Sequence, residues 1–378
     1  MSIMKPSASA GRERDPEQAE AKRSDPGVSG TLRMAVVGLG FVRWLLDEYK
    51  SAPGVELSLL CDLNEARCRE LSDEHGVPWT LRFEDCLAPN IAAVDVSTPN
   101  HLHAEQAVAA LAAGKHVFLQ KPMAPTVADC RTIVSAAAAA GRSVGLFMSH
   151  LNAPHMHELR RMIAAAAFGT LISMRGRSAH RGARANWDKW NVGADYWRRD
   201  RTRTGGGGMA LIGIHVIHLL PWLADSPVES VAAFSDNRAT RDLLDGDDIT
   251  IATARLSNGV LATLEASYAS ERGSVEIYGT AGYAIMEDGR LRVRLDAPWN
   301  GRYLSVAGGE QETVFSHEEL NKMRSDFGAE CEQHGAFARA VLAGEPPPVT
   351  GEDGLRDVAV LEAIYRSAET GRRETPDG

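Results

Sequence analysis

Several features are scarce in this 378-residue sequence, and each scarcity argues against a class of protein. The five cysteines are an odd number and include no CxxC pair, so we expect neither a disulfide framework nor a thiolate zinc site. No apolar run approaches the roughly 18 residues of a membrane span. The N-terminus also lacks the apolar stretch of a secretory signal. These absences predict a cytoplasmic protein with reduced cysteines and no membrane contact.

Positive charge is in the minority. The 41 Lys and Arg residues face 50 Asp and Glu residues, a formal net charge of -9, and such a chain repels a phosphate backbone unless its basic residues cluster. We therefore expect no nucleic-acid partner. Hydrophobic residues at 44% and charged residues at 24% are close to the globular average. At about 150 residues per domain, the length predicts two domains.

Residues 1–30 contain no Leu, Phe, Tyr or Trp. A segment of this composition buries too little apolar surface to offset the entropy of ordering, so we predict a disordered tail. From Leu32 onward, short apolar strands alternate with helical stretches. The predicted strands cover 34–37, 55–60, 92–96, 116–119 and 144–148, and the predicted helices include 103–113 and 127–140. This alternation predicts a doubly wound parallel sheet over residues 31–150.

After about residue 170 the pattern changes to longer strands with a period of two, at 249–256, 260–268 and 275–278. Such strands predict a mainly antiparallel, open sheet. Helices follow at about 326–342 and 355–367, separated by the prolines at 346–348. We therefore predict a second α/β domain, residues 151–378, for substrate binding and oligomerisation, with a last helix able to pack back on the first domain.

A partial dinucleotide fingerprint follows the first strand. Gly38 and Gly40 supply the tight turn and the close approach that a pyrophosphate needs at a helix N-terminus. The third glycine position holds Arg43, which either forces the helix away or lies outward along the phosphates. Asp62 ends the second strand and could accept hydrogen bonds from an adenosine ribose, which favours NAD over NADP. A bare turn at the glycines and a helix cap at Asp62 remain the alternatives.

Ordered motifs then identify a family. Ser97-Thr98-Pro99-Asn100 with His103, Ala113-Gly114-Lys115-His116-Val117, and Lys121-Pro122 resemble the Gfo/Idh/MocA family of sugar and cyclitol oxidoreductases. The resemblance resumes at 205–218 and 362–367. It implies a Rossmann domain, a C-terminal α/β domain with an open antiparallel sheet, bound NAD or NADP, and homodimers or homotetramers formed through that sheet.

The resemblance also implies a catalytic pair. Lys121 matches the lysine of the family's Glu-Lys-Pro motif, although Gln120 replaces the glutamate. His215 matches the histidine of the second domain, whereas Leu211 stands where the family has an aspartate. Helical spacing predicts that residues 211, 215 and 218 share one face. We expect Lys121 to bind the reacting hydroxyl and His215, titrating near neutrality, to exchange its proton.

Together the motifs predict two sets of contacts. Predicted cofactor contacts are Gly38, Gly40, Phe41, Val42, Asp62, Ser97, Thr98, Pro99, Asn100, His103, Gln120 and Lys121. Predicted substrate contacts are Lys121, His150, Trp197, Arg198, Leu211, His215 and His218. His150 stands where relatives of the family commonly carry an arginine.

Residues 175–203 form a local basic and aromatic segment. Eight arginines and Lys189 face three aspartates, with Trp187, Trp190, Tyr196 and Trp197 interleaved. Arginines grip phosphate or carboxylate and aromatic faces stack on sugar rings, so the segment could bind an anionic or nucleotide-linked sugar. Salt bridges to an acidic neighbouring subunit or to the tail are the alternative. The histidines at 150, 155, 157, 215 and 218 lack a characteristic metal-ligand spacing, and no metal is predicted.

The leading interpretation is an NAD-dependent oxidoreductase that transfers a hydride between nicotinamide and a sugar, cyclitol or sugar-derived alcohol or ketone. Two other functions stay open. One is an epimerase or glycosidase that retains its cofactor and uses transient oxidation, and the other is a non-catalytic regulatory or sensor protein with an NAD-binding fold. Leu211 favours the sensor, whereas the retained Lys121 and His215 argue against it.

Overall fold

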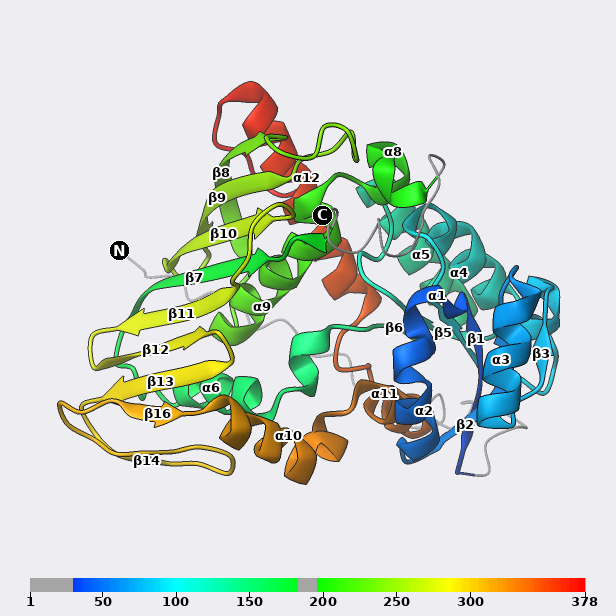
Figure 1. Cartoon of the computed structure of the whole chain (residues 1–378), viewed down its shortest axis with the longest axis horizontal. Coiled ribbons are helices and arrows are strands. Elements are labelled where there is room, and N and C mark those ends of the chain that lie inside the picture. Colours follow the sequence, from blue (N-terminus) through cyan, green and yellow to red (C-terminus); the bar gives the residue numbers. More distant parts are fainter. Residues whose placement is uncertain (1–29, 183–195, 378) are drawn as a thin grey trace, which may run out of the picture.

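The computed structural model describes residues 30–182 and 196–377. Residues 1–29 of the predicted tail and the central part of the basic segment, including Trp187, Lys189 and Trp190, lie outside the described residues. Two sheets dominate the structure, a six-stranded parallel sheet and an eight-stranded, mainly antiparallel one (Figure 1). The predicted fold class is therefore confirmed, because both sheets follow one another along the chain in the predicted order.

The first sheet has the doubly wound strand order β3-β2-β1-β4-β5-β6, with every pair parallel. The chain order reverses between β1 and β4, and the carboxyl ends of strands at such a switch point form the usual ligand crevice. The strands are β1 (Leu32–Val37), β2 (Val55–Cys61), β3 (Trp79–Thr80), β4 (Ala93–Val96), β5 (His116–Leu119) and β6 (Val144–Leu146).

Local capping explains where several helices of this half begin and end. Asn64 caps α3 by accepting a hydrogen bond from the backbone of Arg67, and Thr126 caps α5 in the same way. Glycines in the left-handed conformation, Gly76 and Gly141, end both helices. The α-helices are α1 (Leu39–Val42), α2 (Leu46–Ser51), α3 (Glu65–His75), α4 (His103–Ala112) and α5 (Val127–Ala140), joined by short 3-10 turns at Arg43–Leu45, Phe83–Leu87 and Asn100–Leu102.

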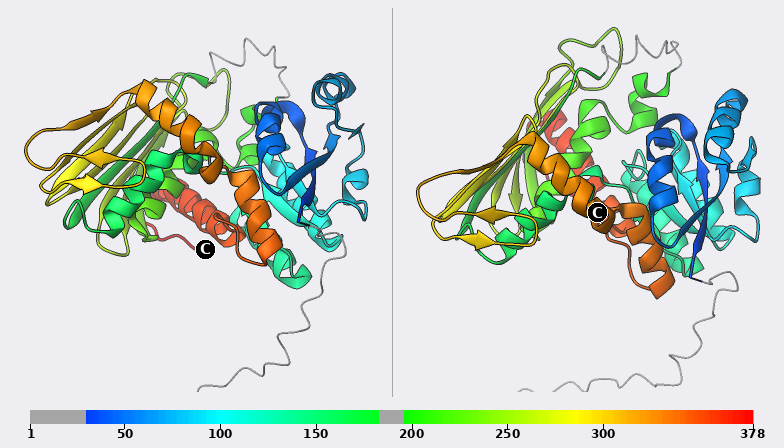
Figure 2. Two further views of the ribbon diagram at one scale, coloured as in Figure 1. Left: turned by 90° about the horizontal axis from the view of Figure 1, so that it is seen from below. Right: turned by 60° about the horizontal axis from the view of Figure 1, so that its bottom comes forward.

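The second sheet has the order β16-β13-β12-β11-β7-β10-β9-β8, in which only the β10 and β7 pair is parallel. Burial alternates along β9, so one face packs against helices and the other does not. Figure 2 shows the helices gathered on the side toward the first sheet. The strands are β7 (Leu171–Ala179), β8 (Val228–Asp236), β9 (Ile249–Leu256), β10 (Leu261–Ser267), β11 (Ser274–Gly279), β12 (Gly282–Glu287), β13 (Arg290–Leu295) and β16 (Thr313–Phe315), with a small hairpin of β14 (Trp299–Asn300) and β15 (Ser305–Val306).

The C-terminal helices correct one prediction. The helix expected at 326–342 is two helices, α10 (His317–Cys331) and α11 (Gln333–Ala343), because Glu332 adopts an extended conformation between them. Its carboxylate accepts hydrogen bonds from the backbone N–H groups of His334 and Gly335 and so caps α11. The sequence has neither glycine nor proline at this break, which is why periodicity alone missed it.

Two C-terminal helices connect the halves of the molecule. Phe337 and Ala338 of α11 are buried in the same cluster as residues of β1, β2 and α2. The last helix, α12 (Gly351–Thr370), packs against α5 on one side and against β8 and α9 on the other. This packing ties the two sheets together.

The remaining helical elements lie in the middle of the chain. They are a 3-10 turn at Ser149–Asn152, α6 (Pro154–Ala164), a 3-10 turn at Trp197–Arg199, α8 (Arg201–Thr204), a π-helical turn at Met209–Gly213, and α9 (Ile214–Ala224). The stretch Arg201–Ala224 is long and apolar enough to cross a membrane by length and composition. Because 83% of its most apolar window is buried inside the protein, we interpret it as a core helix.

Candidate active site

A cavity of about 870 Å³ runs along the carboxyl ends of β1, β2, β4 and β5 to the segment 196–203 of the second half. One end, the cofactor end, is lined by the glycine turn and the residues after β2. The other end, named the substrate end after the predicted substrate contacts Lys121, Trp197 and Arg198, is lined by these three residues with Tyr196 and Arg203. The lining residues are Val37, Gly38, Gly40, Phe41, Arg43, Cys61, Asp62, Leu63, Arg67, Leu81, Phe83, Ser97, Thr98, Pro99, Asn100, His101, Leu102, Gln106, Gln120, Lys121, Tyr196, Trp197, Arg198 and Arg203.

Gly38 makes the turn from β1 into α1. Its φ of 90° lies in the left-handed region, and a Cβ there would lie 2.6 Å from the backbone oxygen of Ser97. Only glycine fits this close crossing of two loops. At Gly40, by contrast, the nearest protein atom to an added Cβ would be Arg67 Nη1 at 3.5 Å, an ordinary contact. The protein itself therefore does not require glycine at position 40, which leaves the cavity side open for a ligand to approach.

Arg43 lines the cofactor end of the cavity and is paired with α3. Its Nη2 forms an ion pair of 3.0 Å with Glu70 Oε1 on α3, and both side chains are largely exposed. The helix after the glycine turn is interrupted at this residue by the 3-10 turn Arg43–Leu45. An arginine in place of the third glycine is thus accommodated by a local change of helix type and an outward side chain.

Asp62 lies beside the glycine turn, as predicted. Its Oδ2 accepts a hydrogen bond of 2.7 Å from the backbone N–H of Leu39, and Arg67 Nη1 lies 3.1 Å from the same atom. Oδ1 accepts one hydrogen bond, from the backbone of Asn64. The cap expected as the alternative for Asp62 belongs instead to Asn64, which begins α3. Asp62 anchors the start of α1 and keeps an oxygen lone pair on Oδ1.

The loops after β4 and β5 form the centre of the cavity. Ser97, Thr98, Pro99, Asn100 and Gln120 line it, and the buried Gln120 Nε2 has no hydrogen-bond partner in the described chain. His103 is buried away from the cavity. Its ring nitrogens lie 2.8 Å from the Thr98 oxygen and 3.1 Å from the Pro122 oxygen, so it joins the two loops.

Lys121 lies where the cofactor loops meet the second half. Its Nζ donates a hydrogen bond of 2.8 Å to the main-chain oxygen of Leu211, in the π-helical turn. Burial, with a further contribution from the positive charge of Arg198, lowers the pKa of Lys121 to about 7. Leu211 stands where the family has an aspartate, and it contacts the lysine through its backbone. Its π-helical turn differs from the regular helix predicted to carry residues 211, 215 and 218.

Three histidines, His150, His215 and His218, lie close to one another, and His215 is a neighbour of Lys121. The ring centroid of His150 lies 5.2 Å from that of His218 and 6.4 Å from that of His215. Burial and the nearby charge of Lys121 hold the pKa of His215 well below its ordinary value. This corrects the near-neutral titration predicted for His215, because the imidazole has a cationic neighbour where the family pattern supplies a carboxylate.

His218 has the carboxylate that His215 lacks. His218 Nδ1 lies 2.8 Å from Asp357 Oδ2 on α12. Burial disfavours the imidazolium, but the charge of Asp357 and this hydrogen bond outweigh it and raise the pKa of His218. Sequence reasoning missed Asp357, since it lies 139 residues beyond His218 and no local motif marks it.

The structure brings most, but not all, of the predicted residues to the cavity. Val42 is buried in the core of the first half, and His150, Leu211, His215 and His218 do not line the cavity as it stands. Missed lining residues include Leu63 and Leu81 near Asp62, and Leu63 is 89% exposed. An apolar residue directly after the strand-end aspartate was the signal that could have indicated Leu63.

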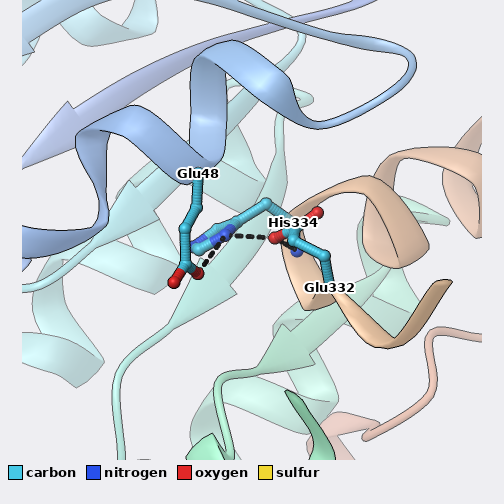
Figure 3. A group of neighbouring side chains, drawn as sticks. All are labelled: Glu48, Glu332 and His334. Atoms are coloured by element: carbon cyan, nitrogen blue, oxygen red, sulfur yellow. Dashed lines mark hydrogen bonds and ion pairs between the residues drawn. The ribbon is translucent and has the colours of Figure 1, made fainter. Parts of the chain in front are cut away.

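One cluster in the described part of the chain has the spacing of a metal site. Glu48, Glu332 and His334 place one potential ligand atom each within 4.8 Å of one another (Figure 3). His334 Nδ1 lies 2.6 Å from Glu332 Oε1, and the same carboxylate caps α11. We interpret the cluster as a helix cap that fixes α11 against α2, because the oxygens of Glu332 already accept N–H groups.

Comparison with known proteins matches the two halves to two parts of one family. Residues 32–148 match the profile "Oxidoreductase family, NAD-binding Rossmann fold", and residues 156–285 match "GFO/IDH/MocA C-terminal domain". The chain is 29% identical over 353 residues to a 1,5-anhydro-D-fructose reductase of Ensifer adhaerens, covering 90% of this chain and 97% of that one. It is 28% identical over 307 residues to a levoglucosan dehydrogenase of Pseudarthrobacter phenanthrenivorans, covering 76% and 70%.

Among solved structures, the WlbA dehydrogenase of Bordetella pertussis in complex with NADH and UDP-GlcNAcA superposes with a TM-score of 0.75. The identity is 22%, and 93% of this chain and 99% of that chain are covered. This similarity supports the fold. With both halves matched in the same order, and the glycine turn, the Ser97–Asn100 loop and Lys121 lining one cavity, the chain belongs to the Gfo/Idh/MocA family of oxidoreductases.

Proposed function

We propose that this protein is an NAD-dependent oxidoreductase that transfers a hydride between nicotinamide and a CH–OH carbon of a sugar, cyclitol or sugar-derived alcohol or ketone. The observation that carries the proposal is Lys121, a lysine with a pKa of about 7 at the junction of the cofactor loops and the second half. The two relatives, a 1,5-anhydro-D-fructose reductase and a levoglucosan dehydrogenase, support this substrate class.

The cavity residues fit a dinucleotide. The Gly38 turn, the open side of Gly40 and the carboxylate of Asp62 would hold its pyrophosphate and adenosine ribose, while the unpaired Gln120 amide is available near the nicotinamide. When bound, the nicotinamide supplies the hydride acceptor or donor. We further propose that NAD is preferred over NADP, because the charge of Asp62 would repel a 2′-phosphate.

Lys121 is proposed to handle the proton. In the direction of oxidation its neutral amine accepts the hydroxyl proton, and in reduction its ammonium returns it to the forming hydroxyl oxygen. The Leu211 carbonyl at 2.8 Å orients Nζ. Lys121 suits this exchange better than His215, whose pKa is held well below its ordinary value and which does not line the cavity.

We also propose that the protein is cytoplasmic and forms homodimers or homotetramers through the outer face of the eight-stranded sheet. Apolar side chains on that face support the proposal, since Phe234 is 87% exposed and Ile251 and Leu261 are about half exposed.

Lys121→Ala tests the proposed function. Loss of the proton-handling group should lower kcat by roughly 10²–10⁴-fold with NADH affinity, followed by quenching of tryptophan fluorescence, unchanged within about threefold. Lys322→Ala on the exposed side of α10 is the matched control and should leave both unchanged. Full turnover of a polyol or ketosugar by Lys121→Ala would remove the proposed centre.

A further inference from the structure

Arg198 is a cation at the substrate end of the cavity, and among residues 30–182 and 196–377 it has no acidic partner. None of the ion pairs formed among the described residues includes it, and its buried Nε makes no hydrogen bond within that part of the chain. Its guanidinium carbon lies 5.1 Å from the ring centroid of Trp197 and 5.9 Å from that of Tyr196. The aromatic faces hold the guanidinium, but they cannot neutralise its charge.

A second cation shares this space. The charge of Arg198 contributes, after burial, to the lowered pKa of Lys121, and it acts in the same way on His180. Lys121 Nζ donates a hydrogen bond to the main-chain oxygen of Leu211, which carries no formal charge. Two cationic side chains therefore act on one partly buried volume, an arrangement that costs free energy unless an anion joins them.

Among the described residues that line the cavity, no carboxylate lies at the substrate end to balance these charges. Gln120 and Leu211 stand where the family pattern has a glutamate and an aspartate. Among the described residues that line the cavity, the one carboxylate is Asp62, which lies at the cofactor end and is paired with Arg67. Gln120 and Leu211 are uncharged, and Arg198 has no acidic partner among the described residues. The substrate end therefore carries excess positive charge.

We propose that the substrate carries an anionic group, a carboxylate or a phosphate, which binds Arg198 next to the reacting CH–OH carbon and replaces the carboxylates absent at positions 120 and 211. A guanidinium binds either group through two parallel hydrogen bonds, and Trp197 offers an aromatic face to the sugar ring beside it. This inference deepens the proposed function and rests on it.

The test measures binding of charged and neutral sugars to the NADH-loaded protein by calorimetry at fixed ionic strength. The probes are D-glucuronate, D-gluconate and D-glucose 6-phosphate, with D-glucose and D-glucitol as neutral counterparts. At least one anionic probe should bind tenfold more tightly than its neutral counterpart, and Arg198→Gln should abolish that difference. A preference confined to the two carboxylates identifies a carboxylate substrate, and one confined to the phosphate identifies a sugar phosphate.

Arg175→Gln is the matched control, because Arg175 is exposed on β7 and pairs with Glu276 at 3.6 Å. It should leave the preference intact. The inference is overturned if no anionic probe binds more tightly than its neutral counterpart, or if the preference survives in Arg198→Gln. It is also overturned if Arg198→Gln weakens NADH binding instead, since the guanidinium would then serve the cofactor.

Failure of this inference is distinguishable from failure of the proposed function. Lys121-dependent oxidation of neutral polyols without a charge preference would leave the oxidoreductase standing and remove the anionic substrate. Anionic sugars that bind through Arg198 but are never oxidised or reduced would support the anion site and remove the proposed reaction.

Discussion

The two ends of the cavity are built in different ways. At the cofactor end, the glycine turn, Asp62 and the loop at Ser97 follow three neighbouring strands of one sheet, and their contacts involve backbone atoms. At the substrate end, Lys121 and Arg198 come from segments far apart in the chain, and their charged side chains decide the chemistry. The cofactor end is therefore fixed by backbone geometry, and the substrate end by charge.

Three residues depart from the family pattern, Arg43, Gln120 and Leu211, and they differ in what they change. Arg43 lies at the cofactor end, where a 3-10 turn and an ion pair with Glu70 accommodate it without changing the glycine turn. Gln120 precedes Lys121 in the chain, and Leu211 contacts its Nζ through a main-chain oxygen, so each departure removes a carboxylate from the surroundings of Lys121. The backbone accommodates the substitution at the cofactor end, whereas the two substitutions near Lys121 change the charge around a bound substrate.

Gly38→Ala should produce the largest effect at the cofactor end. The new Cβ would overlap the backbone of Ser97 at a φ of 90°, so we expect a loss of roughly 3 kcal/mol or more in the free energy of unfolding and loss of NADH binding. Gly40→Ala is the matched control, because its Cβ would make only an ordinary contact with Arg67. It should keep wild-type stability while weakening NADH binding. Urea unfolding and an NADH titration measure both, and equal destabilisation of the two variants would contradict the backbone account.

The pH dependence of kcat tests the substrate end. Because the pKa of Lys121 is lowered to about 7, the neutral amine needed for oxidation is lost below that pH, and the ammonium needed for reduction is lost above it. The rate should therefore fall about tenfold per pH unit on the acidic side for oxidation and on the alkaline side for reduction. Arg198→Gln removes a nearby positive charge and should move the inflection to higher pH. If the inflection lies well below pH 6 and is the same in Arg198→Gln as in the wild type, His215 would instead be the group that exchanges the proton.

The same contrast explains what the sequence predicted. The strand at 249–256 and the helix at 127–140 were predicted with the bounds that the structure shows, because periodicity and caps act within a few residues. Gly38 and Asp62 were found at the cofactor end for the same reason. The contact of Lys121 with the Leu211 carbonyl depends instead on a π-helical turn, and the pairing of His218 with Asp357 spans 139 residues. Neither contact produces a local pattern in the sequence from which it could be predicted.

Arg43→Ala should produce the smallest effect, and it sharpens the comparison at the cofactor end. An exposed ion pair such as the one between Arg43 and Glu70 stabilises a protein by about 0–1 kcal/mol, so the midpoint of urea unfolding should barely move. NADH affinity should stay within about threefold of the wild type, because the guanidinium is already paired with Glu70 on α3. A tenfold loss of NADH affinity at unchanged stability would show that Arg43 leaves Glu70 to bind the cofactor phosphates. In that case charge, and not backbone geometry alone, would hold the cofactor end as well.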